Sequence, residues 1–210
     1  MDEIRRRASQ IDESIEQIGA LDWSHLGEAH RDTAEIFDRL DPKRLLVELQ
    51  LSLGEIVDPV RSVEKTTHYK WFVAADPRDR FKLWLHEYKP KELRREGHAV
   101  IPHNHRFWLS SLILRGGFTD SRYRRVEQPP PRTDWIELEA TRSMSVGSTM
   151  ILAPEEIHAL ADVGDGTVSL IVESAPVRSY SEVFEGGSVR RYYDLEAKLV
   201  DFQRSLDAGA

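Results

Sequence analysis

The chain has 210 residues, of which 40% are hydrophobic and 31% are charged, and its formal net charge is −7. This length suits one well-buried domain with accessory helices, and the acidic balance is the reverse of that in general nucleic-acid binders. The sequence contains no cysteine, which excludes disulfides, cysteine-ligated zinc and a cysteine nucleophile.

The N-terminal sequence lacks the features of a signal peptide, because no apolar segment follows the basic residues 5–7. The longest apolar runs are also far shorter than a membrane span. We therefore expect a cytoplasmic protein that binds neither nucleic acid nor membrane.

Residues 1–58 are predicted to form a helical segment that packs on the remainder of the chain. A first helix is indicated by isoleucines at helical spacing followed by a glycine: Ile4, Ile11, Ile15, Ile18 and Gly19. Ser24 is a candidate cap for a second helix that reaches Leu40. Asp41 and Pro42 are typical of the start of a third helix, and the leucines at 45, 46, 49 and 53 give that helix an apolar stripe.

From about residue 66 the sequence becomes typical of β-strands. Residues 66–74 are rich in threonine and aromatic side chains, a turn follows at 76–79, and residues 81–88 alternate, so this region predicts a hairpin. Further short strands are predicted at residues 99–101, 106–114, 118–126, 135–140, 149–152, 158–162 and 168–173. Many short strands separated by turn residues favour an antiparallel sandwich or barrel, here residues 59–190.

Residues 191–210 are predicted to form a C-terminal helix and tail, with Leu195, Leu199, Phe202 and Leu206 on one face. The apolar stripes of residues 45–53 and 195–206 suit either packing on the barrel or pairing of subunits in a homodimer. Both uses stay open.

Two histidines separated by one residue are the first candidates for chemistry. In a strand, His103 and His105 would face the same way, about 6–7 Å apart along the backbone, and could converge on one ion. Alone this pattern is a weak signal, because paired histidines are more often ordinary hydrogen-bonded residues. The surroundings raise its weight: Gly97 precedes His103 by six positions, and Gly147 and Pro154 precede a third histidine, His158.

These two motifs resemble the signature motifs of the cupin superfamily. The resemblance covers about residues 66–175 and implies a mainly β fold: a cupin, that is a double-stranded β-helix or jelly-roll barrel, with a helical N-terminal segment and a C-terminal helix outside it. It also implies one metal ion held by His103, His105 and His158. Leu109 and Ser110 stand where cupins usually carry a glutamate. A three-histidine set without that carboxylate is similar to the thiol dioxygenases, which bind Fe(II).

The resemblance therefore implies a mononuclear iron dioxygenase that acts on a small molecule, for example a thiol acid, with dioxygen as cosubstrate. Three neutral ligands leave the full charge of the ion in place, which favours an anionic substrate. Two alternatives stay open. One is a non-redox cupin (isomerase, lyase or hydrolase) that uses zinc, nickel or manganese, since imidazole suits all these ions. The other is a cupin that binds a small molecule without turnover.

Four further side chains are candidates for catalysis or substrate binding. Arg115 and Arg122 could hold a substrate carboxylate, although an arginine on a strand more often faces solvent. Tyr123 is a candidate for lining the pocket, and His86 for entering it as an acid or base. Phe107 shares the parity of the histidine pair and is expected to point inward, with Trp108 pointing outward. His98 lies just before the histidine pair but has the opposite parity, and the histidines at 25, 30 and 68 are expected to be ordinary.

Overall fold

The computed structural model describes residues 10–94, 98–126 and 135–193. Three helices come first, and the rest of the described chain consists mostly of strands. The helices are α1 (Gln10–Gly19), α2 (Leu26–Asp38) and α3 (Pro42–Ile56), and two short 3₁₀ turns lie at Lys91–Leu93 and His98–Val100. The strands are β1 (Asp58–Glu64), β2 (His68–Ala75), β3 (Phe81–Tyr88), β4 (Leu109–Arg115), β5 (Gly117–Val126), β6 (Trp135–Ser145), β7 (Thr149–Leu152), β8 (Ile157–Ala161), β9 (Val168–Ser174), β10 (Tyr180–Glu185) and β11 (Ser188–Tyr193).

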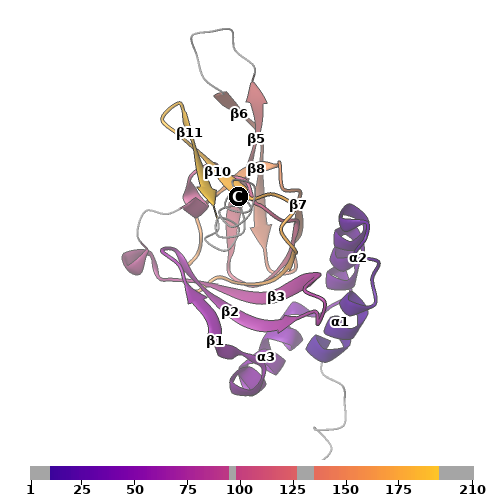
Figure 1. The fold of residues 1–210 in the computed structure, drawn as a ribbon. Helices are drawn as coiled ribbons and strands as arrows, with labels where there is room; N and C mark the ends of the chain where they lie inside the picture. Colours follow the sequence, from indigo (N-terminus) through magenta and orange to yellow (C-terminus); the bar gives the residue numbers. More distant parts are fainter. Residues whose placement is uncertain (1–9, 95–97, 127–134, 194–210) are drawn as a thin grey trace, which may run out of the picture.

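Two antiparallel sheets face each other to form a barrel (Figure 1). The first sheet has six strands in the order β1-β2-β3-β9-β4-β7. The second contains β6-β5-β8 and the hairpin β10-β11. The segment 102–105 lies between these two parts, because His103 forms bridges with both His158 of β8 and Val183 of β10.

The chain passes back and forth between the two sheets as it winds along the barrel. In order, β3 lies in the first sheet, segment 102–105 in the second, β4 in the first, β5 and β6 in the second, β7 in the first, β8 in the second and β9 in the first. Seven strands and segment 102–105, distributed over two facing sheets in this order, form the jelly-roll arrangement. The predicted mainly β fold, with helices at the N-terminal end, is confirmed.

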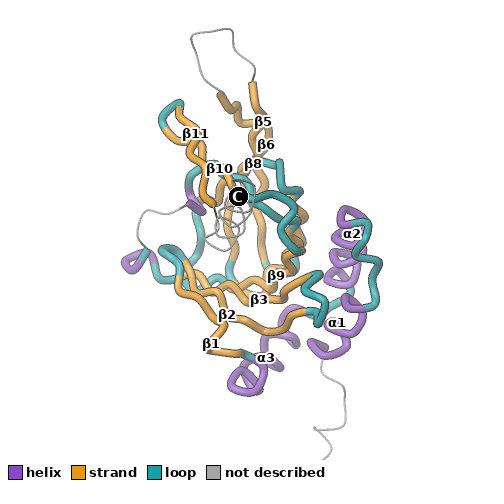
Figure 2. The backbone as a smooth tube through the Cα atoms, in the orientation of Figure 1, coloured by secondary structure: helices purple, strands orange, loops and turns teal. Residues whose placement is uncertain are grey.

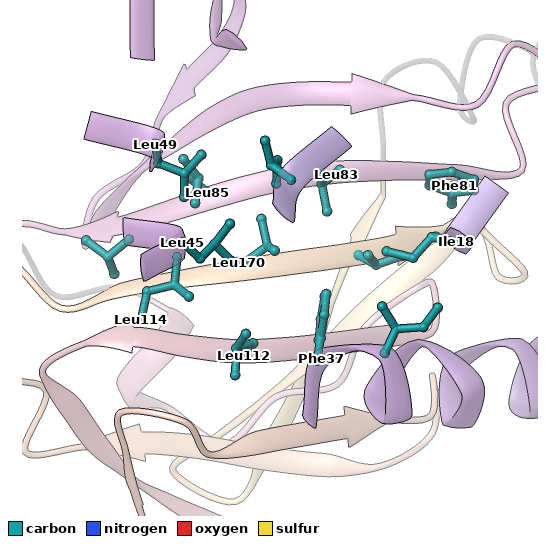
Figure 3. Close-up of a cluster of buried hydrophobic side chains, with 14 of the residues drawn as sticks. Ile18, Phe37, Leu45, Leu49, Phe81, Leu83, Leu85, Leu112, Leu114 and Leu170 are labelled. Carbon is teal, nitrogen blue, oxygen red and sulfur yellow. The ribbon is translucent and has the colours of Figure 1, made fainter. Parts of the chain in front are cut away.

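The three helices cover the outer face of the six-stranded sheet (Figure 2). Their buried side chains meet the outward residues of β3, β4 and β9, as Figure 3 shows. Phe37 of α2 and Leu45 of α3 are fully buried there. The α3 helix begins as predicted, since the Asp41 carboxylate accepts hydrogen bonds from the backbone N–H groups of Lys43 and Arg44. The helices thus form an outer layer, and the barrel interior stays available for a site.

His30 joins α2 to the outer face of β4. Its Nδ1 atom lies 2.7 Å from Ser110 Oγ, and the Ser110 hydroxyl lies 3.1 Å from the His30 carbonyl. The His30 side chain is fully buried, and this burial lowers its pKa to about 3. The imidazole is therefore neutral in the folded protein over the whole physiological pH range.

The buried His30 gives a prediction for acid stability. The unfolded chain takes up a proton near pH 6.5 whereas the folded chain does not, so the unfolding free energy is unaffected above pH 6.5 and falls as the pH drops towards 3. His30→Asn removes this titration while keeping a side chain that can hydrogen-bond to Ser110. As the pH falls from 6.5 to 5, the unfolding free energy of wild type is expected to decrease by about 2 kcal/mol more than that of the variant. Urea unfolding at several pH values measures the difference. The prediction would be contradicted if the unfolding free energies of wild type and variant changed equally with pH.

Several sequence-based predictions of local structure are wrong. The second helix begins at Leu26 with His25 at its cap and no side-chain capping bond, not at Ser24. Residues 98–100 form a 3₁₀ turn in place of the strand predicted at 99–101. Strand β11 continues to Tyr193, in place of the predicted start of a helix; residues 194–210 lie outside the described part of the chain, so the predicted C-terminal helix is not tested. Among the described residues, none of the helices has the length and apolar character needed to cross a membrane.

Candidate metal centre

His103, His105 and His158 meet inside the barrel. Their ring centroids are 4.9 Å apart for His103 and His105, 4.6 Å for His103 and His158, and 5.2 Å for His105 and His158. Each ring offers one nitrogen such that these nitrogens all lie within 4.8 Å of one another. The three residues predicted from the sequence are thus brought together.

The backbone of segment 102–105 fixes the first two histidines. His103 and His158 exchange two backbone hydrogen bonds, each 2.8 Å long. On the other side, the Asn104 N–H donates to the Glu182 carbonyl at 3.0 Å. The Asn104 side chain is buried and also bonds to Glu182, donating to its carboxylate at 2.9 Å and accepting from its backbone N–H at 2.7 Å. The histidine pair is therefore held between β8 and β10 although the segment is too short to be a regular strand.

Hydrogen bonds to the Nδ1 atoms orient two of the rings. His103 Nδ1 lies 2.8 Å from the Ile101 carbonyl, and His158 Nδ1 lies 2.8 Å from Asp120 Oδ1. A carbonyl and a carboxylate can only accept, so each Nδ1 carries the proton and, in the neutral ring, Nε2 is left with its lone pair. Burial opposes ionisation of Asp120, but hydrogen bonds from His158 and Arg122 hold the pKa of that carboxyl below its ordinary value.

This donor set fits a single transition-metal ion. His105 Nε2 lies 3.0 Å from His158 Nε2, which is the separation of two nitrogen ligands at about 2.1 Å from one ion and at right angles. In the absence of an ion, the same distance suits a hydrogen bond from one Nε2 to the other. Burial, followed by the nearby His103 and His158, lowers the pKa of His105 well below its ordinary value, so the ring is neutral as a ligand must be.

The histidines occupy neighbouring strands of a double-stranded β-helix, two just before β4 and one on β8. The fold is therefore a double-stranded β-helix, that is a jelly-roll barrel, as the sequence motifs led us to expect. Gly97, which belongs to the first sequence motif, lies outside the described residues. The second motif is described: Gly147 adopts a φ of +84°, and its N–H donates to the Ile113 carbonyl in the turn before β7.

No family model matches the chain, and no curated protein matches it. Solved structures do match, among them the crystal structure of ectoine synthase from P. lautus. The two chains are 16% identical, the match covers 60% of this chain and 77% of that one, and the TM-score is 0.40. A likeness at this level carries no conclusion about the activity of this chain, and the description of the fold rests on the strand topology.

The three histidines open onto a cavity of about 350 Å³ inside the barrel. The facing wall belongs to the six-stranded sheet and carries Lys70, His86, Ser111 and Glu173 among apolar side chains. Lys70 Nζ donates to both carboxylate oxygens of Glu173, at 2.6 and 2.8 Å, and lies 4.2 Å from the centre of the Trp84 ring. The cavity therefore contains a buried ion pair as well as the histidine cluster.

Two more histidines, His68 and His86, lie on this wall, stacked with ring centroids 4.5 Å apart. Burial lowers the pKa of His68 to about 3 and that of His86 well below its ordinary value, so both rings are neutral. Burial also lowers the pKa of Lys70, while the Glu173 carboxylate opposes that shift.

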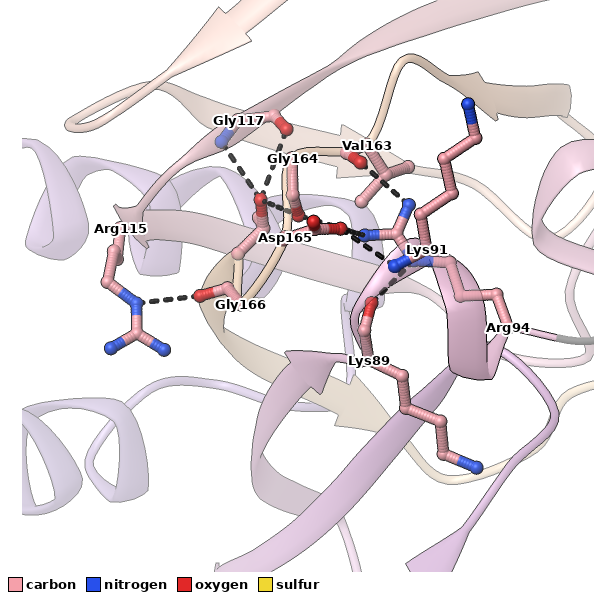
Figure 4. Close-up of polar contacts among 10 residues, drawn as sticks. Lys89, Lys91, Arg94, Arg115, Gly117, Val163, Gly164, Asp165 and Gly166 are labelled. Carbon is pink, nitrogen blue, oxygen red and sulfur yellow. Dashed lines mark hydrogen bonds and ion pairs between the residues drawn. The ribbon is translucent and has the colours of Figure 1, made fainter.

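The other sequence candidates lie in different places. His86 does enter the cavity. Arg115 is on the surface, where its Nε donates to the Gly166 carbonyl at 2.6 Å (Figure 4), and it does not line the cavity. Arg122 donates to Asp120 Oδ2 and to Glu156, so it supports the partner of His158 and makes no contact with the cavity. Tyr123 is likewise absent from the cavity wall. Phe107 lines the cavity and Trp108 faces His30 of α2, as their parity predicted.

Sequence reasoning missed Lys70, Glu173, Ser111 and His68 as cavity residues. Lys70 and Glu173 are 103 positions apart, and no local pattern connects them. Two of the four had a usable signal: Ser111 shares the parity of the histidine pair, and His68 stands on the predicted strand paired with the one that carries His86.

Proposed function

We propose that this protein is a metal-dependent enzyme that acts on a small anionic molecule by non-redox chemistry, as an isomerase, lyase or hydrolase. His103, His105 and His158 would hold one divalent ion such as zinc, nickel, manganese or iron. When bound, such an ion supplies Lewis acidity that favours ionisation or polarisation of a substrate oxygen.

The observation that carries this proposal is the buried Lys70–Glu173 pair, which shares the cavity with the histidine cluster. The side chains are only 14% and 8% exposed. A buried ion pair is weak evidence for stability, because desolvation of both charges offsets their attraction. In a cavity beside candidate metal ligands, such a pair is instead a candidate for proton transfer.

The proposed roles follow from the chemistry of each group. Glu173 is an acceptor and can take a proton from a substrate atom beside its carboxylate. Lys70 is the counter-ion of that carboxylate and, because burial lowers its own pKa, can return a proton from Nζ. Phe107, Leu109 and Leu152 provide apolar surface that excludes water from the reacting groups.

The second candidate is an iron dioxygenase acting on a small molecule such as a thiol acid. One observation favours it: the ligand set is three neutral imidazoles. At the positions of the usual cupin glutamate, Leu109 lines the cavity without a polar group, and Ser110 points away towards His30. Dependence on dioxygen distinguishes the two candidates.

The test begins with metal analysis of protein purified without oxygen. We expect about one transition-metal ion per chain in wild type and near-complete loss in His103→Ala and His158→Ala, with the circular dichroism spectrum of the barrel retained. His25→Ala, which changes an exposed histidine on the helical side, is the control and should retain the metal. Full metal content in both cavity variants would overturn the site.

The metal-loaded protein is then incubated with a panel of small carboxylic acids, enolisable ketones and thiol acids, with and without oxygen, and the mixture is followed by NMR. Turnover that is independent of oxygen and is lost in Glu173→Gln supports the non-redox enzyme. Turnover accompanied by oxygen uptake supports the dioxygenase and overturns the first proposal.

A further inference from the structure

Two buried polar atoms on the cavity wall lack any hydrogen-bond partner in the described part of the chain. These are His86 Nε2 and Ser111 Oγ. The His86 side chain belongs to a residue only 7% exposed, and Ser111 is 2% exposed. Folded proteins rarely leave such groups unsatisfied, because burial removes their hydrogen bonds to water. Both residues line the cavity, so a molecule held there can supply the missing partner.

Two adjacent serines on β4 differ in this respect, one on each face of the strand. Ser110 and Ser111 are both buried and point to opposite faces of the sheet. Ser110 faces the helices and is bonded to both Nδ1 and the carbonyl of His30. Ser111 faces the cavity and has no partner among the described residues. The hydroxyl on the helix side is thus satisfied within the chain, although Nε2 of His30 is not, whereas the hydroxyl on the cavity side has no partner among the described residues.

The two unpartnered groups lie across the barrel from the candidate metal ligands. His86 is on β3 and Ser111 on β4, both in the six-stranded sheet, while His103, His105 and His158 belong to the second sheet. Facing sheets are separated by about 10 Å, so a small molecule can touch both walls at once.

The charge balance of this wall restricts what it binds. Lys70 is neutralised by Glu173, the His86 ring is neutral, and serine carries no charge. A second anionic group placed between His86 and Ser111 would meet no uncompensated cation on these two residues, and Lys65, which also lines the cavity, is exposed to solvent. A neutral group that donates or accepts a hydrogen bond satisfies both His86 and Ser111 without bringing a charge into the interior.

We propose that Ser111 and His86 form a recognition subsite for an uncharged hydroxyl, carbonyl or amide group of the substrate, whose anionic end lies at the three histidines. The assignment of the anionic end rests on the proposed function. A cavity of about 350 Å³ is at the small end of ligand sites, so the substrate class is a short organic acid with one neutral oxygen-bearing group at its far end.

Stability of the metal-free protein provides the first test. Ser111→Ala removes an unsatisfied group and is expected to leave the melting temperature unchanged or raise it, as is His86→Phe. Ser110→Ala leaves His30 without its partner and is expected to lower the melting temperature by roughly 2–4 °C or more. An equal loss in Ser110→Ala and Ser111→Ala would show that Ser111 has a structural role and would overturn the subsite.

Ligand binding provides the second test. Nickel-loaded protein is titrated with pairs of acids that differ only in a terminal hydroxyl, namely 2-hydroxybutanoate against 2,4-dihydroxybutanoate and 2-hydroxypentanoate against 2,5-dihydroxypentanoate. In wild type the extra hydroxyl of at least one pair should tighten binding about 10-fold. That gain should disappear in Ser111→Ala and His86→Phe and persist in Ser143→Ala, which changes an exposed serine on β6.

The outcomes separate this subsite from the proposed function. Absence of any gain in wild type, or a gain that survives in both cavity variants, overturns the subsite even when nickel is bound at one ion per chain. If wild type binds no metal, the proposed function fails. The subsite is then judged on the stability comparison and on NMR titration with uncharged 1,4-butanediol, whose binding must weaken in Ser111→Ala for the subsite to stand.

Discussion

Replacing Lys70 by methionine is expected to destabilise the protein by about 3–5 kcal/mol, because it leaves the Glu173 carboxylate buried without its counter-ion. Methionine has a similar length and can keep the contact with the Trp84 ring. The loss of stability therefore reports the unpaired charge more than the lost packing. Urea unfolding of the metal-free protein at pH 7 measures the effect.

The double variant Lys70→Met/Glu173→Met distinguishes a charge effect from a packing effect. With both charges removed, we expect most of the lost stability to return, although activity should stay absent. Lys82→Met is the control: its ion pair with Asp79 is at the surface, with side chains 39% and 71% exposed, and is worth less than about 1 kcal/mol. If Lys70→Met cost no more than Lys82→Met, the Lys70–Glu173 pair would behave as a solvated pair and not as a buried one.

Replacing Asp120 by asparagine is expected to weaken metal binding about 10- to 100-fold. Asp120 uses both carboxylate oxygens, one to accept from His158 Nδ1 and the other to accept from Arg122 Nε. Asparagine has one acceptor, so its NH₂ group must face one of these two donors. The His158 ring then loses either its orientation or the charge that makes Nε2 a stronger ligand. Competition with a chelator of known affinity measures the change.

Glu137→Gln is the matched control for that measurement. Glu137 also pairs with an arginine of β5, but its pair with Arg124 is exposed, with side chains 62% and 52% accessible, and neither residue bonds to a histidine of the described chain. We expect unchanged metal affinity in this variant. Wild-type affinity in Asp120→Asn would mean that the Asp120 hydrogen bond does not support His158 as a ligand.

The elements with strong local signals could be predicted from the sequence. Asp41 and Pro42 start a helix by capping chemistry that needs no tertiary context, and the hairpin of β2 and β3 follows from its alternating residues and its turn. The three histidines could be predicted because their motifs include the glycine and proline that shape the surrounding turns.

The sequence could not predict which side chains of β3 face the barrel interior and which face the helices, because both faces of this strand are buried. Leu83 and Leu85 pack under the helices, while Trp84 and Tyr88 point into the barrel. Alternation normally separates an apolar face from a polar one, but a strand covered on both sides has no such contrast. The same limit applies to Lys70, whose charge suggests an exposed position and whose partner on β9 is remote in sequence.

The β10–β11 hairpin has a local signal in the sequence that competes with a helical one. Its two-residue turn is Gly186-Gly187, with φ values of +58° and +77°, which is the pattern of tight hairpin turns. The prediction of a helix from residue 191 rests instead on the helical spacing of leucines that come after β11 in the sequence. The aromatic residues at the end of β11 fit either pattern, and strand pairing decides their conformation.

Segment 102–105 forms backbone hydrogen bonds to both β8 and β10, and it also contains two of the candidate metal ligands. The same hydrogen bonds therefore hold the second sheet together and position these ligands. An ion that binds only when segment 102–105 is hydrogen-bonded to both strands would stabilise this paired state over the locally opened one. The stabilisation is about 2.7 kcal/mol when the free ion is at a hundredfold excess over its Kd. Hydrogen–deuterium exchange would then slow as the free metal concentration rises at amides that donate between segment 102–105 and its two neighbouring strands, among them Asn104, His158 and Phe184. The β4–β9 ladder would be affected less. The free metal concentration around the protein would thereby determine how often segment 102–105 separates locally from β8 and β10.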